Sequence, residues 1–371
     1  MADRYGPLEG LAVNPDFWRG KRVFLTGHTG FKGGWLCMLL RSLGATVHGY
    51  ALTPPTTPSL FVEAGVESML ASHTLADIRD PVALTDAMLR ADPDVVLHLA
   101  AQPLVRYSYR EPVETFAVNV MGTVNLLEAV RQHGGVRAIV NVTTDKCYEN
   151  REWLWPYREN EAMGGRDPYS ASKGCAELVT AAYRSAFLAA GGTSVATARA
   201  GNVIGGGDWA DDRLIPDFLR AIDRGVELVI RSPRATRPWQ HVLEPLSGYL
   251  MLVERLYGNG AEYAEGWNFG PREDDAKPVE WLLREFAKAF PGMSWRTEST
   301  STLHEAHYLS LDSSKAHHRL GWRPRWSLQT ALVQTAAWHK AWRNGEDMAA
   351  FTQAQIELYR QSGLEAVCGA A

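Results

Sequence analysis

The chain has 371 residues, of which 46% are hydrophobic and 22% are charged, so it can bury a large core and is not expected to be disordered. Its formal net charge of −4 disfavours a general nucleic-acid-binding protein, which needs basic side chains to neutralise phosphates. The four cysteines show no metal-ligand spacing, and no apolar run has the length of a membrane helix. We therefore expect a cytoplasmic protein with reduced thiols and no metal, membrane or nucleic-acid partner.

Short apolar strands alternate with longer amphipathic stretches through the first 200 residues. We expect strands at residues 22–26, 46–52, 94–100, 138–144 and 194–200, and helices at 35–43, 82–90, 112–133 and 170–190. Apolar strands separated by helices are typical of a parallel sheet that is covered on both faces. The sequence therefore predicts an α/β protein with a Rossmann-like, doubly wound parallel sheet.

The pattern changes after residue 201, where glycine- and proline-rich loops separate shorter helices. We expect loops around 205–207 and 231–239, helices at 243–257 and 279–290, irregular chain at 291–303 and a helical tail at 328–359. We assign residues 17–202 to a dinucleotide-binding domain, to which the chain returns near 239–262 and 306–318. The rest of 203–371 is expected to form a smaller, mixed C-terminal substrate domain.

A glycine-rich segment, TGHTGFKG at residues 26–33, follows the first strand and opens the first helix. Glycines with this spacing allow a tight turn and bring backbone N–H groups close to a pyrophosphate at the helix N-terminus. The segment therefore predicts dinucleotide contacts from Gly27, His28, Thr29, Gly30, Phe31 and Lys32. No acidic residue follows the second strand, so the residues alone leave NAD and NADP open, although the lack of an arginine disfavours NADP.

Two other strand ends are expected to border the dinucleotide. Asp77 and Ile78 follow the third strand and can contact adenine, although Asp77 is equally compatible with an ordinary polar strand end. Leu99, Ala100 and Ala101 follow the strand at 94–100 on the same edge of the sheet, and we assign them to the same site.

Tyr169 and Lys173 lie four residues apart in an expected helix, so they share one face. A lysine ammonium beside a phenol stabilises the phenolate and is expected to lower the pKa of Tyr169. Tyr169 then becomes a base for a sugar hydroxyl, and Lys173 can also bind the nicotinamide ribose. After a glycine-rich turn, this pair predicts a sugar oxidoreductase.

These motifs, in this order, resemble the extended short-chain dehydrogenase/reductase superfamily of nucleotide-sugar enzymes over about residues 17–326. Longer stretches at 27–35, 144–153, 167–178, 205–217 and 235–250 resemble the CDP-glucose 4,6-dehydratase family. The resemblance implies NAD as cofactor and CDP-glucose as substrate, converted into CDP-4-keto-6-deoxyglucose for deoxysugar synthesis. The superfamily also implies a homodimer through the helices near 109–133 and 170–190, with a homotetramer left open.

The triplet Thr144-Asp145-Lys146 ends the strand at 138–144. By resemblance, Thr144 belongs to the catalytic set, Asp145 is the acid that protonates the departing C6 hydroxyl, and Lys146 is the base that removes the C5 proton. Similar enzymes for dTDP-glucose and GDP-mannose carry glutamate at the third position. An adjacent Asp–Lys pair favours two charged forms, which is the wrong state for both roles, unless desolvation reverses it. The backbone must also leave strand geometry near Asp145, because neighbours on a strand point to opposite faces.

Arginines that follow residue 200 suit a diphosphate, because guanidinium groups bind phosphate oxygens in pairs. By resemblance we place Asn202, Arg213 and Arg237 at the diphosphate, with a weaker assignment for Arg231. Cytosine could lie near Trp209 or Tyr308.

Three other functions stay open on the residues alone. A C4 epimerase or simple dehydrogenase needs only the Tyr–Lys pair, and a dehydratase could act on a different nucleotide hexose. A non-catalytic NAD(H)-binding protein could share the fold, although such proteins can dispense with the Tyr–Lys pair that this chain keeps.

Overall fold

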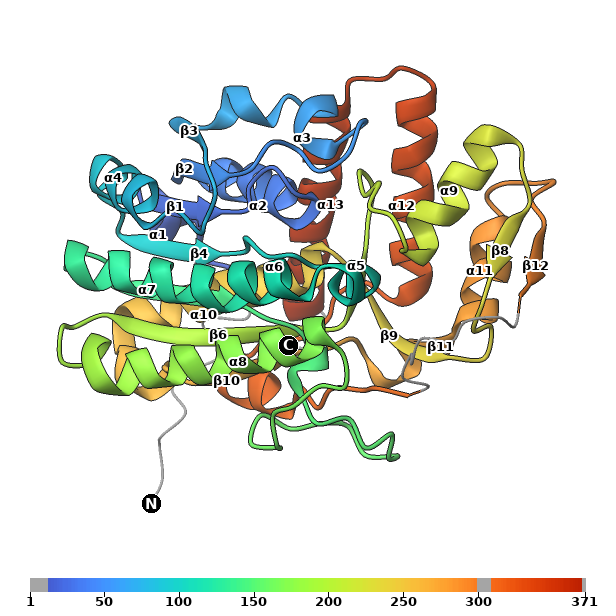
Figure 1. The fold of residues 1–371 in the computed structure, drawn as a ribbon. Coiled ribbons are helices and arrows are strands. Elements are labelled where there is room, and N and C mark those ends of the chain that lie inside the picture. Colours follow the sequence, from blue (N-terminus) through green and yellow to red (C-terminus); the bar gives the residue numbers. More distant parts are fainter. Residues whose placement is uncertain (1–12, 299–307, 369–371) are drawn as a thin grey trace.

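The computed structural model of the chain describes residues 13–298 and 308–368, with side chains described up to residue 362. A seven-stranded sheet crosses the molecule in the order β10-β6-β5-β4-β1-β2-β3 (Figure 1), and all its neighbouring strands are parallel. Its strands are β1 (Arg22–Thr26), β2 (Thr46–Ala51), β3 (Ser72–Leu75), β4 (Val95–His98), β5 (Ala138–Val142), β6 (Ser194–Ala200) and β10 (Gly266–Phe269). The predicted Rossmann-like sheet is confirmed.

Helices cover both faces of this sheet (Figure 1). Alternate side chains of β1 enter different apolar clusters, with Val23 and Leu25 in one and Phe24 in the other. The clusters are completed from opposite sides of the sheet, the first by α2 (Phe31–Ser42) and α10 (Leu243–Tyr263), the second by α4 (Pro81–Ala91) and α7 (Gly122–His133). The strands are apolar along their length because both faces are covered.

Two predicted long helices each contain a wider π turn. The segment expected as one helix at 112–133 consists of α6 (Pro112–Phe116), η2 (Ala117–Met121) and α7, and the one at 170–190 consists of α8 (Pro168–Tyr183) and η4 (Arg184–Leu188). The turn η2 carries Asn119, whose Nδ2 donates to Ser172 Oγ on α8 at 2.9 Å and whose Oδ1 accepts from Gln102 N at 2.8 Å. Asn119 therefore ties the loop after β4 to α8.

A smaller group of strands and helices lies beside the parallel sheet (Figure 1). It contains a three-stranded sheet in the order β11-β9-β7, in which β9 is parallel to β7 and antiparallel to β11, and a two-stranded sheet of β8 and β12. These strands are β7 (Asn202–Ile204), β8 (Leu228–Ile230), β9 (Thr236–His241), β11 (Ala276–Pro278) and β12 (Trp295–Thr297). The predicted smaller, mixed region is confirmed.

Two stretches that we predicted as irregular form strands. The loop expected at 231–239 contains the start of β9, and the irregular chain expected at 291–303 contains β12. Such short strands show no clear alternation of their own and are defined by the strands with which they pair. The predicted helical tail forms two helices, α12 (Leu328–Arg343) and α13 (Met348–Cys368), which are separated near Gly345, whose φ of 72° is left-handed.

The chain returns to the large sheet through α10 and β10, and β10 extends the sheet beyond β6. The other helices and turns are α1 (Pro15–Trp18), α3 (Leu60–Glu63), η1 (Val66–Met69), α5 (Val105–Arg110), η3 (Asp145–Cys147), α9 (Leu214–Arg224), η5 (Glu273–Asp275), α11 (Val279–Ala287) and η6 (Ala316–Leu320). None of the helices within the described ranges has the length and apolar character that crossing a bilayer requires.

Candidate active site

A cavity of about 1150 Å³ opens between the parallel sheet and the smaller region. It lies where the carboxyl ends of β1, β4 and β5 meet, the usual place for ligands in such sheets. Most of the residues predicted for the site line this cavity: Gly27, Thr29, Gly30, Phe31, Lys32, Asp77, Ile78, Leu99, Ala100, Ala101, Thr144, Asp145, Lys146, Tyr169, Lys173, Asn202, Arg213 and Arg237. Segments that are far apart in the sequence therefore share one site.

Three predicted residues are not among those that line the cavity. His28 is buried behind the glycine loop, where its Nε2 lies 2.7 Å from His73 Nδ1 and burial lowers its pKa to about 4. Trp209 packs against Trp338, with ring centroids 5.6 Å apart, so its indole is used in the core. The Tyr308 carbonyl accepts a hydrogen bond from Asn150 Nδ2 at 3.1 Å, and the neighbouring Leu309 lines the cavity in its place.

The glycine loop has the shape that a dinucleotide pyrophosphate requires. Gly27 has a φ of 77°, and a Cβ added there would lie 2.7 Å from Ala100 N. A Cβ added at Gly33 would lie 2.1 Å from Gly27 O. Side chains are thus excluded at both positions, and the first turn of α2, whose N–H groups lack intrahelical acceptors, borders the cavity.

The cavity lining near the ends of β2 and β3 includes Asp77 and Ile78, which we predicted to contact adenine. Tyr50 to Thr53 line the cavity after β2 and supply no carboxylate. Asp77 also lines it, and Arg79 Nε donates to Asp77 Oδ1 at 3.0 Å. This hydrogen bond lowers the pKa of Asp77, so the carboxylate is held ionised and fixed in place at the cavity edge.

The chain leaves strand geometry at the Thr144 triplet, as its chemistry requires. Strand β5 ends at Val142, and Thr144 caps the short turn η3, with its Oγ1 accepting from Lys146 N at 3.3 Å. The Thr144 hydroxyl also donates to Asp145 Oδ1 at 2.9 Å. Because the chain turns here, Asp145 and Lys146 both line the cavity.

Burial is the largest effect on the pKa of Asp145. Its side chain is 3% exposed, and burial raises its pKa, against the opposing effects of Lys146 and of the Thr144 hydrogen bond. Its Oδ2 has no hydrogen-bond partner among the described residues. Desolvation therefore outweighs the neighbouring charge, and it shifts the pKa of Asp145 in the direction that a general acid needs.

The structure corrects our expectation for Tyr169, whose pKa we predicted to be lowered. Burial raises the pKa of Tyr169 to about 12, although a hydrogen bond from Thr144 acts in the opposite direction. Lys173 Nζ donates to the Val142 carbonyl at 3.3 Å, and burial lowers the pKa of Lys173 itself to about 8. The Tyr–Lys pair is in place at the start of α8, but burial outweighs the stabilisation of a phenolate.

Guanidinium groups gather on the side of the cavity that faces the smaller region. Arg213 Nη1 lies 2.9 Å from Asp208 Oδ2, and Arg237 Nη1 donates to the Thr236 carbonyl at 3.0 Å. Together with Asn202, both arginines line the cavity. This arrangement suits a ligand with two phosphate groups.

Four further arginines line the cavity, of which only Arg231 was predicted; the others are Arg106, Arg151 and Arg166. Arg106 and Arg231 both approach Asp212 Oδ1, at 3.4 Å and 3.6 Å. Arg231 Nη1 is buried without a hydrogen-bond partner among the described residues, so it can accept an anion. Arg106 lies in α5, the first helix after β4, and its place in the segment that follows a strand of the sheet was the available signal.

Comparisons with known proteins show the family of the chain. The family model described as GDP-mannose 4,6 dehydratase matches residues 24–335. A CDP-glucose 4,6-dehydratase of Salmonella typhimurium is 54% identical over 353 residues, which are 94% of this chain and 98% of the relative. A dTDP-glucose 4,6-dehydratase of Streptomyces antibioticus is 29% identical and covers 86% of this chain and 92% of its own length.

Solved structures show the same fold at low identity. The dTDP-glucose 4,6-dehydratase of Streptomyces venezuelae, solved with NAD and TYD bound, has a TM-score of 0.74 and 24% identity, and the match covers 88% of this chain and 99% of that one. The UDP-glucose 4-epimerase of Thermotoga maritima has a TM-score of 0.73 and 22% identity, over 86% of this chain and 99% of that one. From the extent of the family match and the 54% identity, we conclude that the chain belongs to the GDP-mannose 4,6 dehydratase family and, within it, to the CDP-glucose 4,6-dehydratases.

Proposed function

We propose that the protein removes water from CDP-glucose to form CDP-4-keto-6-deoxyglucose, with NAD as a cofactor that is not consumed. The observation that carries this proposal is that Asp145 and Lys146 line the same cavity as Tyr169 and Lys173. Oxidation at C4 needs only the Tyr–Lys pair, whereas elimination across C5 and C6 needs a further acid and base. The relative with 54% identity is named for this reaction and for this nucleotide, which favours CDP-glucose over other nucleotide hexoses.

The cofactor residues fit this proposal, since the glycine loop at the cavity packs too closely on its own backbone and on the end of β4 to carry side chains at Gly27 and Gly33, and no arginine lies after β2 to hold a 2′-phosphate. We assign Gly27, Gly30, Asp77 and Ala100 to the dinucleotide. When bound, NAD⁺ supplies an acceptor for the C4 hydride and returns that hydride to C6.

The first task of the protein is to take the proton of the C4 hydroxyl while C4 is oxidised. Tyr169 is the base for this step. Because burial raises its pKa, the phenolate needs nearby positive charge, and Arg213 acts in that direction. Lys173 Nζ donates to the Val142 carbonyl, and with a pKa of about 8 most of it is an ammonium at neutral pH.

The second task is to move two protons at C5 and C6. The C4 ketone acidifies the C5 hydrogen, and Lys146 accepts that proton as the C5–H electron pair forms the C5–C6 double bond. Asp145 donates its proton to the C6 hydroxyl, which leaves as water. After hydride arrives at C6, Lys146 returns a proton to C5, so the sugar has lost one water and no external oxidant is used.

The nucleotide end of the substrate is assigned to the smaller region. Asn202, Arg213 and Arg237 hold the diphosphate, and Arg106 and Arg231 add positive charge to the same wall of the cavity. Their forked guanidinium groups can each donate two hydrogen bonds to phosphate oxygens.

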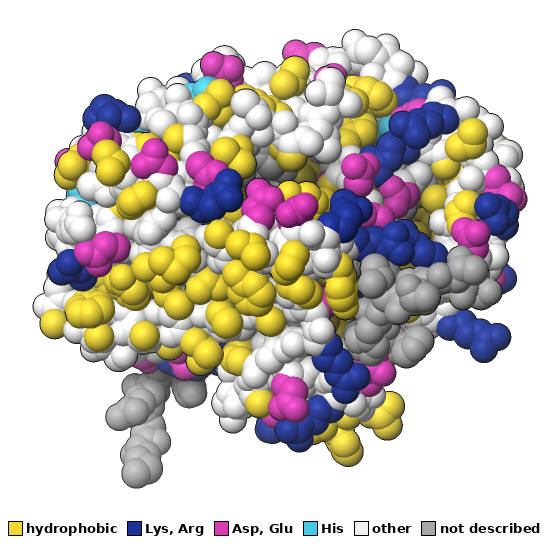
Figure 2. Space-filling model, in the orientation of Figure 1, with side chains coloured by type: hydrophobic (Ala, Val, Ile, Leu, Met, Phe, Trp, Pro, Cys, Tyr) yellow, Lys and Arg dark blue, Asp and Glu magenta, His cyan; other side chains and the backbone are white. Residues whose placement is uncertain are grey.

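We also propose that the protein is a homodimer, which can assemble further into a tetramer. Figure 2 shows hydrophobic side chains gathered over the surface that α6, η2 and α8 form in Figure 1. Large apolar residues are exposed here, among them Val113 at 82% and Leu178 at 62%. A continuous apolar surface of this kind favours contact with a second copy, as the superfamily resemblance implies.

The experiment that tests the function is a substrate panel. The purified protein with NAD⁺ is incubated with CDP-, dTDP-, UDP- and GDP-hexoses, and the masses of the products are measured by mass spectrometry. We expect loss of one water from CDP-glucose. A product of unchanged mass with inverted C4 would indicate an epimerase, and no conversion of any hexose would indicate a binding protein.

A further inference from the structure

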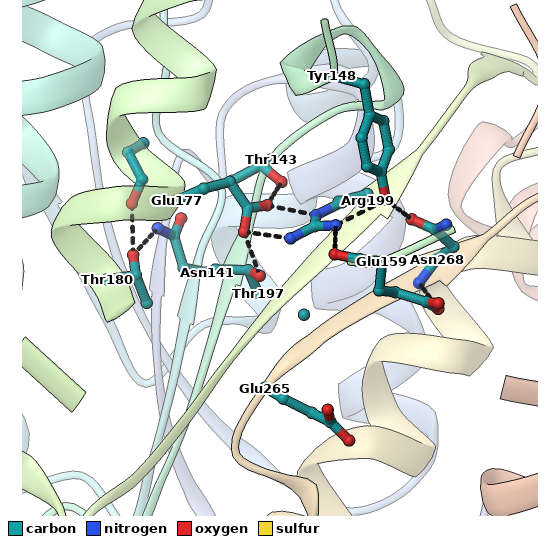
Figure 3. Close-up of polar contacts among 12 residues, drawn as sticks. Asn141, Thr143, Tyr148, Glu159, Glu177, Thr180, Thr197, Arg199, Glu265 and Asn268 are labelled. Carbon is teal, nitrogen blue, oxygen red and sulfur yellow. Dashed lines mark hydrogen bonds and ion pairs between the residues drawn. The ribbon is translucent and has the colours of Figure 1, made fainter. Parts of the chain in front are cut away.

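A buried ion pair of Glu177 and Arg199 contacts the chain just before and just after the Thr144 triplet (Figure 3). Glu177 is on α8, one turn after Lys173, and Arg199 is on the neighbouring strand β6. Arg199 Nε lies 2.8 Å from Glu177 Oε1, and Arg199 Nη2 lies 2.8 Å from Oε2, so the pair is bidentate. The two residues are only 6% and 4% exposed.

This pair holds the chain on both sides of the Thr144 triplet. On one side, Thr143 Oγ1 donates to Glu177 Oε1 at 2.5 Å. On the other side, Arg199 Nη1 donates to the Tyr148 hydroxyl at 2.6 Å. Figure 3 shows these contacts meeting at one guanidinium–carboxylate pair, so the turn that carries Asp145 and Lys146 is fixed at both ends.

The pair is fully hydrogen-bonded, which is what a buried charge needs to persist. Glu177 Oε2 also accepts from Thr197 Oγ1 at 2.6 Å, and the Tyr148 hydroxyl donates to Asn268 Oδ1 at 2.7 Å. Burying two charges costs more than packing apolar side chains of the same volume, so such a pair contributes little to stability by itself. Its main effect here is to fix the end of β5, the strand β6 and the helix α8 relative to one another.

Glu177 also acts on Lys173. The titratable groups that interact with the Lys173 ammonium are Glu177 on its own helix, Cys147 in η3, Lys32 at the start of α2 and His98 at the end of β4. Burial lowers the pKa of Lys173 to about 8, and the carboxylate of Glu177 is the largest effect in the opposite direction. The same side chain therefore contacts the catalytic turn and supports the charge of the catalytic lysine.

We propose that Glu177 and Arg199 form a positioning pair, which fixes the turn of Asp145 and Lys146 relative to Tyr169 and places a carboxylate one helical turn from Lys173. Neither residue is among those that line the cavity, so both act through their neighbours. The proposal rests on the dehydratase function and adds residues that act behind the site.

Two variants test the two parts of the proposal. Thr143→Val removes one hydroxyl and leaves the ion pair intact, and we expect the exchange of the C5 hydrogen with solvent to fall about tenfold while KM stays within about twofold. Glu177→Gln removes the carboxylate charge, which lowers the pKa of Lys173 further, so we expect the high-pH decline of kcat to begin about one pH unit lower.

The matched control is Thr180→Val. Thr180 is buried on α8, and its hydroxyl accepts from Asn141 Nδ2 at 2.8 Å; among the described residues, no side-chain hydrogen bond joins it to the ion pair (Figure 3). We expect this variant to keep the C5 exchange rate and the pH profile of the unaltered protein.

The outcomes separate the two levels of the argument. Failure of the unaltered protein to dehydrate CDP-glucose would contradict the proposed function itself. If the unaltered protein is active, the positioning role is contradicted when Thr143→Val keeps full C5 exchange, when Glu177→Gln folds and keeps the unaltered pH profile, or when Thr180→Val reproduces either change. Should Glu177→Gln not fold, the Thr143→Val result decides.

Discussion

At Asp145, burial and a neighbouring charge act in opposite directions on one proton. The sequence shows the adjacent lysine and therefore the effect that favours ionisation. The structure adds the burial, which is the larger effect and raises the pKa of Asp145. For Tyr169 the reasoning from sequence was wrong, because burial raises its pKa to about 12 although a hydrogen bond with Thr144 and the charge of Arg213 act in the opposite direction. Residue types can be read from the sequence, but desolvation depends on the folded surroundings.

Lys146→Ala separates oxidation from elimination. The variant keeps Tyr169 and Lys173, so we expect added CDP-glucose still to reduce bound NAD⁺, seen as absorbance of the reduced cofactor in a single turnover. Without the base, exchange of the C5 hydrogen with solvent deuterium should fall by a factor of about 10² or more. Exchange at the unaltered rate would remove Lys146 from this role.

Arg237→Ala tests the diphosphate assignment. Loss of a charged hydrogen-bond donor from the cavity wall should raise KM for CDP-glucose about tenfold or more and change kcat less, because the contact is made equally in ground and transition states. The matched control is Arg234→Ala, an exposed arginine of the same segment. Equal KM values for the two variants would contradict the assignment.

At the scale of elements, what the sequence could predict depends on whether the element carries an apolar pattern of its own. The strands at 22–26 and 194–200 were predicted with their observed bounds, because both are continuous apolar runs in a covered parallel sheet. β9 and β12 were missed, since they exist through their pairing partners. The π turns η2 and η4 were also missed, as helical spacing continues on either side of them.

The glycine loop yields a prediction about close packing. A methyl group at Gly33 would lie 2.1 Å from Gly27 O, so Gly33→Ala should displace the loop and weaken NADH binding about tenfold or more, measured by fluorescence titration. Gly258→Ala on α10 is the control, because a Cβ there meets nothing within 4 Å. Equal affinities of the two variants for NADH would contradict a role of this close packing in cofactor binding.

At the scale of the whole molecule, the cavity joins residues from two regions that the sequence keeps far apart. Tyr169 and Lys173 come from α8, which packs on the large sheet, while Arg213 and Arg237 come from the smaller region. The motifs predicted these residues, but their common cavity depends on the folded arrangement of the two regions. Trp209 packs against the tryptophans of α12 and is not among the residues that line the cavity. The division into residues 17–202 and 203–371 stays a prediction.

The apolar surface over α6 and α8 yields a prediction about assembly. Leu178→Glu places a charge in the proposed dimer contact, so we expect the mass measured by light scattering to fall towards one chain. Leu89→Glu on α4, where the leucine is 57% exposed, is the control and should leave the mass unchanged. If Leu178→Glu keeps the mass of the unaltered protein, the contact lies elsewhere.

The most direct test of the dehydratase account follows one hydrogen. CDP-glucose that carries deuterium at C4 is converted by the unaltered protein with NAD⁺, and the product is analysed by mass spectrometry and NMR. The account predicts a sugar lighter by one water, with the deuterium now at C6 and no accumulation of reduced cofactor. Deuterium that remains at C4 of a product with unchanged mass, or that collects in the cofactor, would contradict it.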